Sequence, residues 1–132
     1  MSPHERSLLN YLYLAKVSSQ KQQRPWRDRF LVMSLVKAVH TGWLEIAEEC
    51  RRIITDDSPR HLLNRHATAA EAMRTEDFAF FAKQLERGCP PERAEQLAQG
   101  LGFDADAALA ACPQELSRLL NELLQGFGGS AG

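Results

Sequence analysis

Cysteine is scarce in this chain, and its spacing offers no disulfide framework. Cys50, Cys89 and Cys112 lie far apart in a sequence of 132 residues, and their number is odd. Small secreted domains that depend on disulfides carry an even set of cysteines at characteristic spacings. We therefore expect three reduced thiols and a cytoplasmic protein.

The chain also lacks a long apolar run. Its densest apolar stretch, residues 30–39, is interrupted by Ser34 and Lys37. This stretch is well short of the roughly 20 residues that span a bilayer. The first six residues, Met-Ser-Pro-His-Glu-Arg, have neither the charged nor the apolar region of a secretory signal. We expect no association with a membrane.

No cluster of residues in the sequence points to an enzyme. There is no glycine-rich phosphate-binding loop, no paired acid and base, and no ligand set for a metal. The four histidines lack the i, i+4 pairing of a helical zinc site: His4, His40, His61 and His66. The glutamates of residues 45–49 lie next to Arg51 and Arg52, which would neutralise them. The sequence thus predicts no catalytic residue, no cofactor and no metal site.

The cysteines do not change this prediction. Cys50 falls on the buried stripe of an amphipathic helix, where a thiol is inert. Cys89 and Cys112 each precede a proline that starts a helix, a position that lowers a thiol pKa in general. Neither has a histidine or a second cysteine nearby in sequence, so we expect no nucleophilic or redox chemistry.

Charge of one sign is not in excess, since the formal net charge is −1. The two halves nevertheless differ: residues 1–65 carry a balance of +4, and residues 66–132 carry a balance of −5. The total gives no general attraction to nucleic acid or to a membrane surface. Such an asymmetry can steer a partner or orient a second copy of the chain; the alternative is an uneven distribution of surface charge without a function.

What the sequence does have is helical periodicity nearly throughout. Residues 43–54 show it most clearly, because six apolar positions share one helix face: Trp43, Ile46, Ala47, Cys50, Ile53 and Ile54. A strand over residues 30–36 is a competing interpretation, but no period of two is present there. Capping residues, prolines and glycines predict helices at about residues 2–17, 26–41, 43–55, 59–65, 68–73, 75–87, 91–99, 105–111 and 113–124.

These helices predict an all-α fold, a compact multi-helix bundle. We expect a single helical domain over residues 1–125 and a flexible glycine-rich tail over residues 126–132. The helical pattern places these residues in the core: Leu12, Leu31, Leu35, Ile46, Ala47, Cys50, Ile53, Phe78, Phe81, Leu85, Leu97, Leu116 and Leu120.

Residues 31–59 resemble a tetratricopeptide-type helical hairpin in the N-terminal half. Gly42 stands at the turn between the two helices, Ala47 at the small crossing position of the second, and Pro59 at the closing position. The sequence departs from the family pattern at Leu35, where a small residue is usual, and at two further positions, Ala38 and Arg51. No second copy at a similar period is present. The resemblance implies a hairpin of two packed antiparallel helices, and not an array of repeats.

A basic segment covers residues 16–29. Lys21, Arg24, Arg27 and Arg29 could contact phosphates, and Trp26 among them could stack on a base. These residues support the hypothesis of a nucleic-acid-binding helical protein. The competing interpretation is a solvated segment that leads into a helix, with Trp26 turned into the core. The balanced net charge and the lack of a helix-turn-helix signature favour that interpretation.

The leading functional hypothesis is a non-enzymatic protein-interaction or adaptor module. Helical proteins without catalytic motifs commonly act by presenting a groove or face to another protein, or to a second copy of themselves. The aromatic residues that could anchor a partner are Tyr11, Tyr13, Trp26, Trp43 and Phe103. A small enzyme or ligand-binding protein, with a pocket assembled from residues distant in sequence, is a further alternative.

Overall fold

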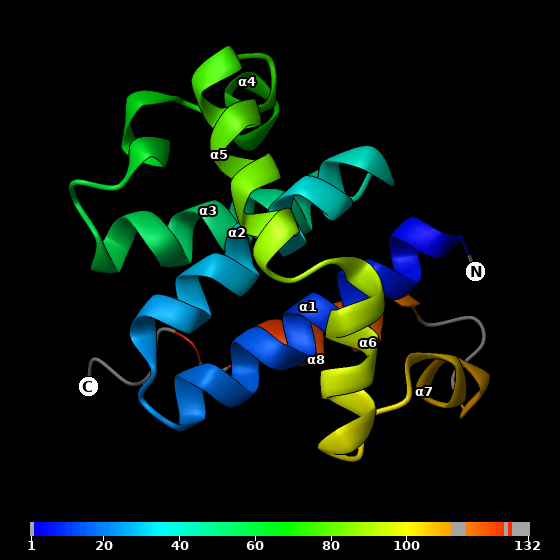
Figure 1. The fold of residues 1–132 in the computed structure, drawn as a ribbon. Helices are drawn as coiled ribbons and strands as arrows, with labels where there is room; N and C mark the ends of the chain where they lie inside the picture. Colours follow the sequence, from blue (N-terminus) through cyan, green and yellow to red (C-terminus); the bar gives the residue numbers. More distant parts are fainter. Residues whose placement is uncertain (1, 112–115, 126, 128–132) are drawn as a thin grey trace.

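The chain is helical throughout the computed structural model, which describes residues 2–111, 116–125 and 127 (Figure 1). Within these residues it contains no strand, so the prediction of an all-α, multi-helix fold is confirmed. In chain order the elements are α1 (Pro3–Gln20), α2 (Arg24–His40), α3 (Leu44–Asp57), the 3-10 helix η1 (Leu62–Arg65), α4 (Ala69–Met73), α5 (Glu76–Gly88), α6 (Pro91–Gly100), α7 (Ala105–Ala111) and α8 (Leu116–Leu124).

The other elements gather around α1 and α2 (Figure 1). These two helices pack against each other more extensively than any other pair, and α1 also contacts α6, α7 and α8. A capping box starts α1: the Glu5 amide donates to the Ser2 hydroxyl, and the Ser2 amide donates to the Glu5 carboxylate. Because neighbours lie on several sides, α1 buries more than one stripe of residues.

Gly42 ends α2 and directs the chain into α3. Its φ of +81° lies in the left-handed region, which side chains other than glycine rarely adopt. The Trp43 amide donates to the Ala38 carbonyl over 2.8 Å, the hydrogen bond of a glycine-terminated helix. The predicted helix stop at Gly42 is therefore confirmed, and α3 packs against α2 directly after it.

The helix predicted over residues 59–65 is wrong. The chain there is a turn followed by η1, which has four residues. His61 has extended backbone angles, and its Nδ1 accepts a hydrogen bond from the Leu63 amide over 3.1 Å. This side-chain cap starts the helical turn only at Leu62, so no longer helix forms.

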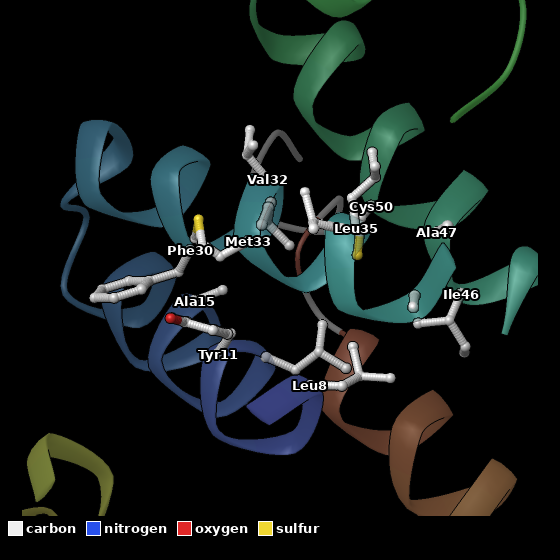
Figure 2. Close-up of a cluster of buried hydrophobic side chains, with 14 of the residues drawn as sticks. Leu8, Tyr11, Ala15, Phe30, Val32, Met33, Leu35, Ile46, Ala47 and Cys50 are labelled. Atoms are coloured by element: carbon white, nitrogen blue, oxygen red, sulfur yellow. The ribbon is translucent and has the colours of Figure 1, made fainter. Parts of the chain in front are cut away.

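Most of the predicted core residues are buried (Figure 2). Nine of the thirteen are at most 3% exposed, and the other four pack against the core while partly exposed: Phe81, Leu85, Leu97 and Leu116. The close-up shows the region where side chains of α1, α2 and α3 meet, with Tyr11 from α1 beside Phe30 from α2. Interior burial of this kind is the main stabilising contribution to the fold.

Phe127 differs from its predicted place in a flexible tail. Its side chain is only 1% exposed and belongs to the hydrophobic core. The rest of the predicted tail, residues 126 and 128–132, lies outside the described part of the chain. The core therefore includes a residue three positions beyond the end of α8.

Candidate functional site

The aromatic side chains expected to bind a partner have different environments. The prediction that Tyr11 anchors a partner at the surface is wrong, because Tyr11 is fully buried and its hydroxyl donates to the Cys89 carbonyl over 2.8 Å. Tyr13 and Phe103 are partly buried and stack on each other with ring centroids 4.4 Å apart. Trp43 is also partly buried, and its Nε1 donates to the Glu5 carboxylate. Trp26 is the exposed one of the five, at 49%.

Trp26 stands beside an open apolar groove of about 520 Å³ between α1, α2 and α6. Its apolar walls come from Leu14, Val17, Trp26, Phe30, Leu97 and Leu101. Leu101, on the α6 side, is 47% exposed. Apolar side chains exposed at the edge of a hollow are typical of a binding surface, since water contacts them at a cost in free energy.

A second hollow of about 220 Å³ lies on the other side of Trp26, between α2 and α5. Trp26 and Phe30 line both hollows; Phe30 is only 7% exposed, so the half-exposed indole of Trp26 forms the ridge that the two hollows share. Their ring centroids are 6.0 Å apart in a stacked arrangement. The groove and the second hollow together are called the Trp26 surface below.

Of the four basic residues expected to contact nucleic acid, two line the Trp26 surface, one in each hollow. Lys21 lines the groove, and Arg29 lines the second hollow with its guanidinium 4.9 Å from the centroid of the Trp26 ring. Arg24 is exposed and lies beside a separate polar hollow on the α1–α2 turn.

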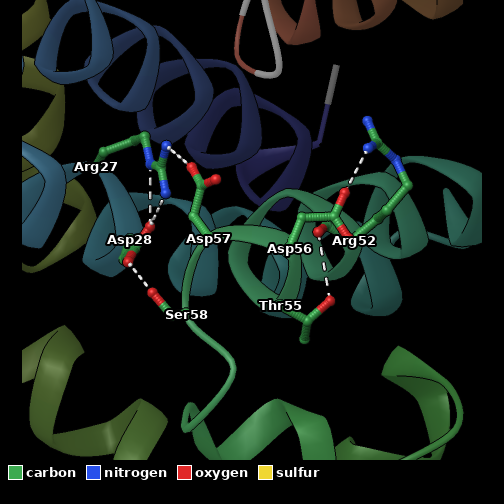
Figure 3. A network of polar contacts seen from close by, with 7 residues as sticks. All are labelled: Arg27, Asp28, Arg52, Thr55, Asp56, Asp57 and Ser58. Atoms are coloured by element: carbon green, nitrogen blue, oxygen red, sulfur yellow. Dashed lines mark hydrogen bonds and ion pairs between the residues drawn. The ribbon is translucent and has the colours of Figure 1, made fainter. Parts of the chain in front are cut away.

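The prediction that Arg27 contacts nucleic acid is wrong. Its side chain is buried, and its guanidinium donates to Asp28 and Asp57, each over 2.7 Å (Figure 3). Burial by itself lowers the pKa of Arg27, but the carboxylates of Asp57 and Asp28 together outweigh this effect and raise the pKa, so the cation persists at any ordinary pH. Asp28 also accepts a hydrogen bond from Ser58. Arg27 joins the start of α2 to the end of α3. It borders the same polar hollow as Arg24, but it is only 2% exposed and its guanidinium is already paired.

Comparison of the chain with protein-family models, with curated proteins and with solved structures found no match. The functional hypotheses below therefore rest on the chain's own residues.

Groups that could perform chemistry are scattered. Within the described residues, no three His, Cys, Asp or Glu side chains come together as a metal site. Burial raises the pKa of both the Cys50 and Cys89 thiols, which favours the unreactive protonated form. Cys112 lies outside the described residues. Among the same residues, no helix is both long and apolar enough to cross a bilayer.

The contribution of α6 to the groove was not predicted from the sequence. Leu97 was assigned to the core, yet it lines the groove together with Leu101. Leu101 is the C-cap residue of α6 and is 47% exposed, although its spacing from Ala94 and Ala98 continues the inward stripe of this helix. Helical periodicity alone would therefore have assigned Leu101 to the core.

His61 makes stability depend on pH. Burial lowers the pKa of its imidazole, with a smaller opposite effect from Asp28. The unfolded chain, with a histidine pKa of about 6.5, therefore binds the proton more readily than the folded protein. Stability should be highest above this value and should fall as the pH drops through it. Protonation also removes the acceptor for the Leu63 amide.

A thermal-unfolding series from about pH 7.5 to about pH 5.5 tests this dependence. We expect the Tm to fall with pH, and to fall less in His61→Asn, whose amide oxygen can cap η1 without titrating. A residual slope should remain in that variant, because desolvation and His4 also lower the pKa of His40. Parallel curves for the wild type and His61→Asn would contradict the assignment.

Proposed function

We propose that this chain is a non-enzymatic protein-interaction module that binds apolar side chains of a partner at the Trp26 surface. The observation that carries the proposal is Trp26 itself, half-exposed on a ridge between two apolar hollows. Tryptophan is enriched among residues that dominate binding energy at interfaces. The groove volume of about 520 Å³ lies within the range of about 300 to 1,000 Å³ that is typical of ligand pockets.

The apolar character of the lining supports a protein partner over a highly charged ligand. Six of the eleven residues that line the groove are apolar side chains, and one, Lys21, carries a charge. Burying such a surface against apolar side chains releases water from both partners, which is the main favourable term in protein association. A phosphate backbone would gain little from these walls.

Trp26→Ala tests the proposal. We expect it to weaken binding of a partner captured from cell lysate, and then purified, by about 30-fold or more, as for an interface hot spot of about 2 kcal/mol. Leu44→Ala is the matched control, because Leu44 is 51% exposed and lies outside the Trp26 surface. Circular dichroism should show that both variants remain folded. Equal affinities for the two variants would refute the proposal.

As part of this proposal, residues 31–59 form a tetratricopeptide-like helical hairpin. Three local features support this assignment: α2 packs on α3, Gly42 forms the turn between them, and Ala47 at the crossing position is fully buried. We also place the protein in the cytoplasm, where a reducing environment suits the free thiols of Cys50 and Cys89.

Binding of nucleic acid is the second candidate function, favoured by the contact between Arg29 and the Trp26 ring. Lys21 and Arg24 would add phosphate contacts, whereas Arg27 is withdrawn from this hypothesis. A gel shift with single-stranded RNA over a series of salt concentrations separates the candidates. Binding that weakens steeply with salt and is lost in Trp26→Ala would favour nucleic acid.

A further inference from the structure

We infer that the partner segment bound at the Trp26 surface is an amphipathic helix with an acidic polar face, contributed by another protein. This inference rests on the proposed function and adds the chemistry of the ligand. It draws on two independent properties of the surface, its extent and the sign of its charge.

The apolar surface continues beyond one hollow. It passes from Leu101 through the groove to the Trp26 ridge and into the second hollow, where Met33 and Leu85 lie. Gln84 also lines that hollow, and Phe80, with 66% of its side chain exposed, lies one helical turn before Gln84 on α5. Of the four large apolar residues that are exposed in the described chain, Trp26 and Leu101 line this surface.

An extended apolar surface of this kind suits a ligand with several apolar side chains in a row. An amphipathic helix presents them at positions i, i+3 or i+4, and i+7 along one face. Two hollows on either side of a ridge can receive residues from successive turns of such a helix. The Trp26 ring would then contact the side chains between them.

The charges at this surface are of one sign. Among the described residues that line the two hollows, Lys21 and Arg29 are the charged ones, and no Asp or Glu is present. Within the part of the chain that the structure describes, Lys21 and Arg29 form no ion pair, so their charges are available. Lys83 and Arg87, both exposed, flank Gln84 on α5.

Carboxylates on the partner's polar face would complement this charge. The acidic residue of α5 closest in sequence to Gln84, Glu86, already pairs with Lys37 on α2. On α6, Glu92 and Glu95 are outside the groove lining. Complementary charge adds specificity and speeds association more than it adds affinity. The inference is therefore a statement about selectivity between acidic and basic helices.

Fluorescence anisotropy with designed peptides tests the inference on the full-length chain. The first peptide is a fluorescein-labelled helix of about four turns, with leucine at i, i+3, i+4 and i+7 spacing and glutamate on its other faces. The second has lysine in place of every glutamate. The third keeps the composition of the first but scrambles the leucine spacing. We expect the acidic helix to bind at least about tenfold more tightly than the other two, and less tightly at high salt.

Charge reversal sharpens the test. Lys21→Glu combined with Arg29→Glu should reverse the preference between the acidic and basic peptides. Arg60→Glu is the control for a general change in charge, because Arg60 is exposed and lies outside the Trp26 surface. Trp26→Ala should weaken binding of the acidic peptide, and Leu44→Ala should leave it unchanged.

The outcomes separate the inference from the proposed function. If acidic and basic helices bind equally and Trp26→Ala weakens both, the charge selectivity is overturned and the interaction surface stands. If no peptide binds, while a captured protein still depends on Trp26, the inference is overturned and the proposed function stands. If Trp26→Ala weakens neither the binding of the peptides nor the binding of the captured protein, both the inference and the proposed function are overturned. If sedimentation shows self-association that Trp26→Ala abolishes, the inference is overturned and the ligand is a second copy of the chain. If the chain binds RNA and Trp26→Ala abolishes this binding, the inference is overturned and the ligand is a nucleic acid.

Discussion

Phe127→Ala is expected to lower the free energy of unfolding by about 3 to 5 kcal/mol. The Phe127 side chain is fully enclosed in the core, three residues after α8 ends. Truncating a buried phenylalanine removes its transfer free energy and leaves a cavity that the surroundings fill only in part. Urea denaturation of the wild type and the variant, compared at equal m-values, measures the difference.

Phe80→Ala is the matched control for this prediction. Phe80 is 66% exposed, so its truncation should change stability by about 0.5 kcal/mol or less. A chain ending at Gln125 should lose about as much stability as Phe127→Ala, because both lack the same buried ring. If Phe127→Ala costs no more than Phe80→Ala, Phe127 does not belong to the core in solution.

Arg27→Ala is expected to cost about 2 to 4 kcal/mol of folding free energy. Arg27 is 2% exposed, and its guanidinium is hydrogen-bonded to the carboxylates of Asp28 and Asp57. Its removal leaves two carboxylates close together without a cation between them. It also breaks the link between the start of α2 and the end of α3 (Figure 3).

A double-mutant cycle with Asp57→Asn isolates this link. The combined variant should lose less stability than the sum of the two single losses, because each substitution removes the same pair. Arg24→Ala is the matched control on the same helix, and it should change stability by about 0.5 kcal/mol or less since Arg24 is exposed. Equal losses for Arg24→Ala and Arg27→Ala would show that the buried network does not stabilise the fold.

The sequence predicted the helices well because their signals are local. The capping residues Ser2 and Thr75 begin α1 and α5 as expected, since each side chain accepts a backbone amide three residues later. The apolar stripe of α3 is buried at Ile46, Cys50 and Ile53. The exception is the turn before η1. There the His61 side chain caps the helical turn and sets its first residue, and histidine is not among the residues that usually predict a helix start.

The candidate site was predicted less well because it depends on contacts between distant residues. Tyr11 and Tyr13 are two positions apart on α1, yet one is buried against the chain near Cys89 and the other stacks on Phe103. Periodicity alone could not predict this difference, because several helices cover α1. The groove itself combines α1 and α2 with α6, which begins only at Pro91, after three further α-helices and η1.

The basic segment shows the same distinction within a few residues. Arg24, Arg27 and Arg29 look equivalent in the sequence, but α2 turns Arg27 inward and leaves the other two exposed. Which of them is buried depends on Asp57, thirty residues later. A pairing over that separation has no local signal, and so a residue that stabilises the fold was predicted to bind a ligand.

The hydrogen bond from the Tyr11 hydroxyl to the Cys89 carbonyl has a consequence for the rate of the proposed binding at the Trp26 surface. It fastens the segment that leads from α5 into α6 onto α1, and burial raises the pKa of the phenol, so the donor keeps its proton. The helices on either side of the site are thereby held at a fixed separation before any ligand arrives. Such a preorganised cleft needs no opening step, and little conformational entropy is lost on association.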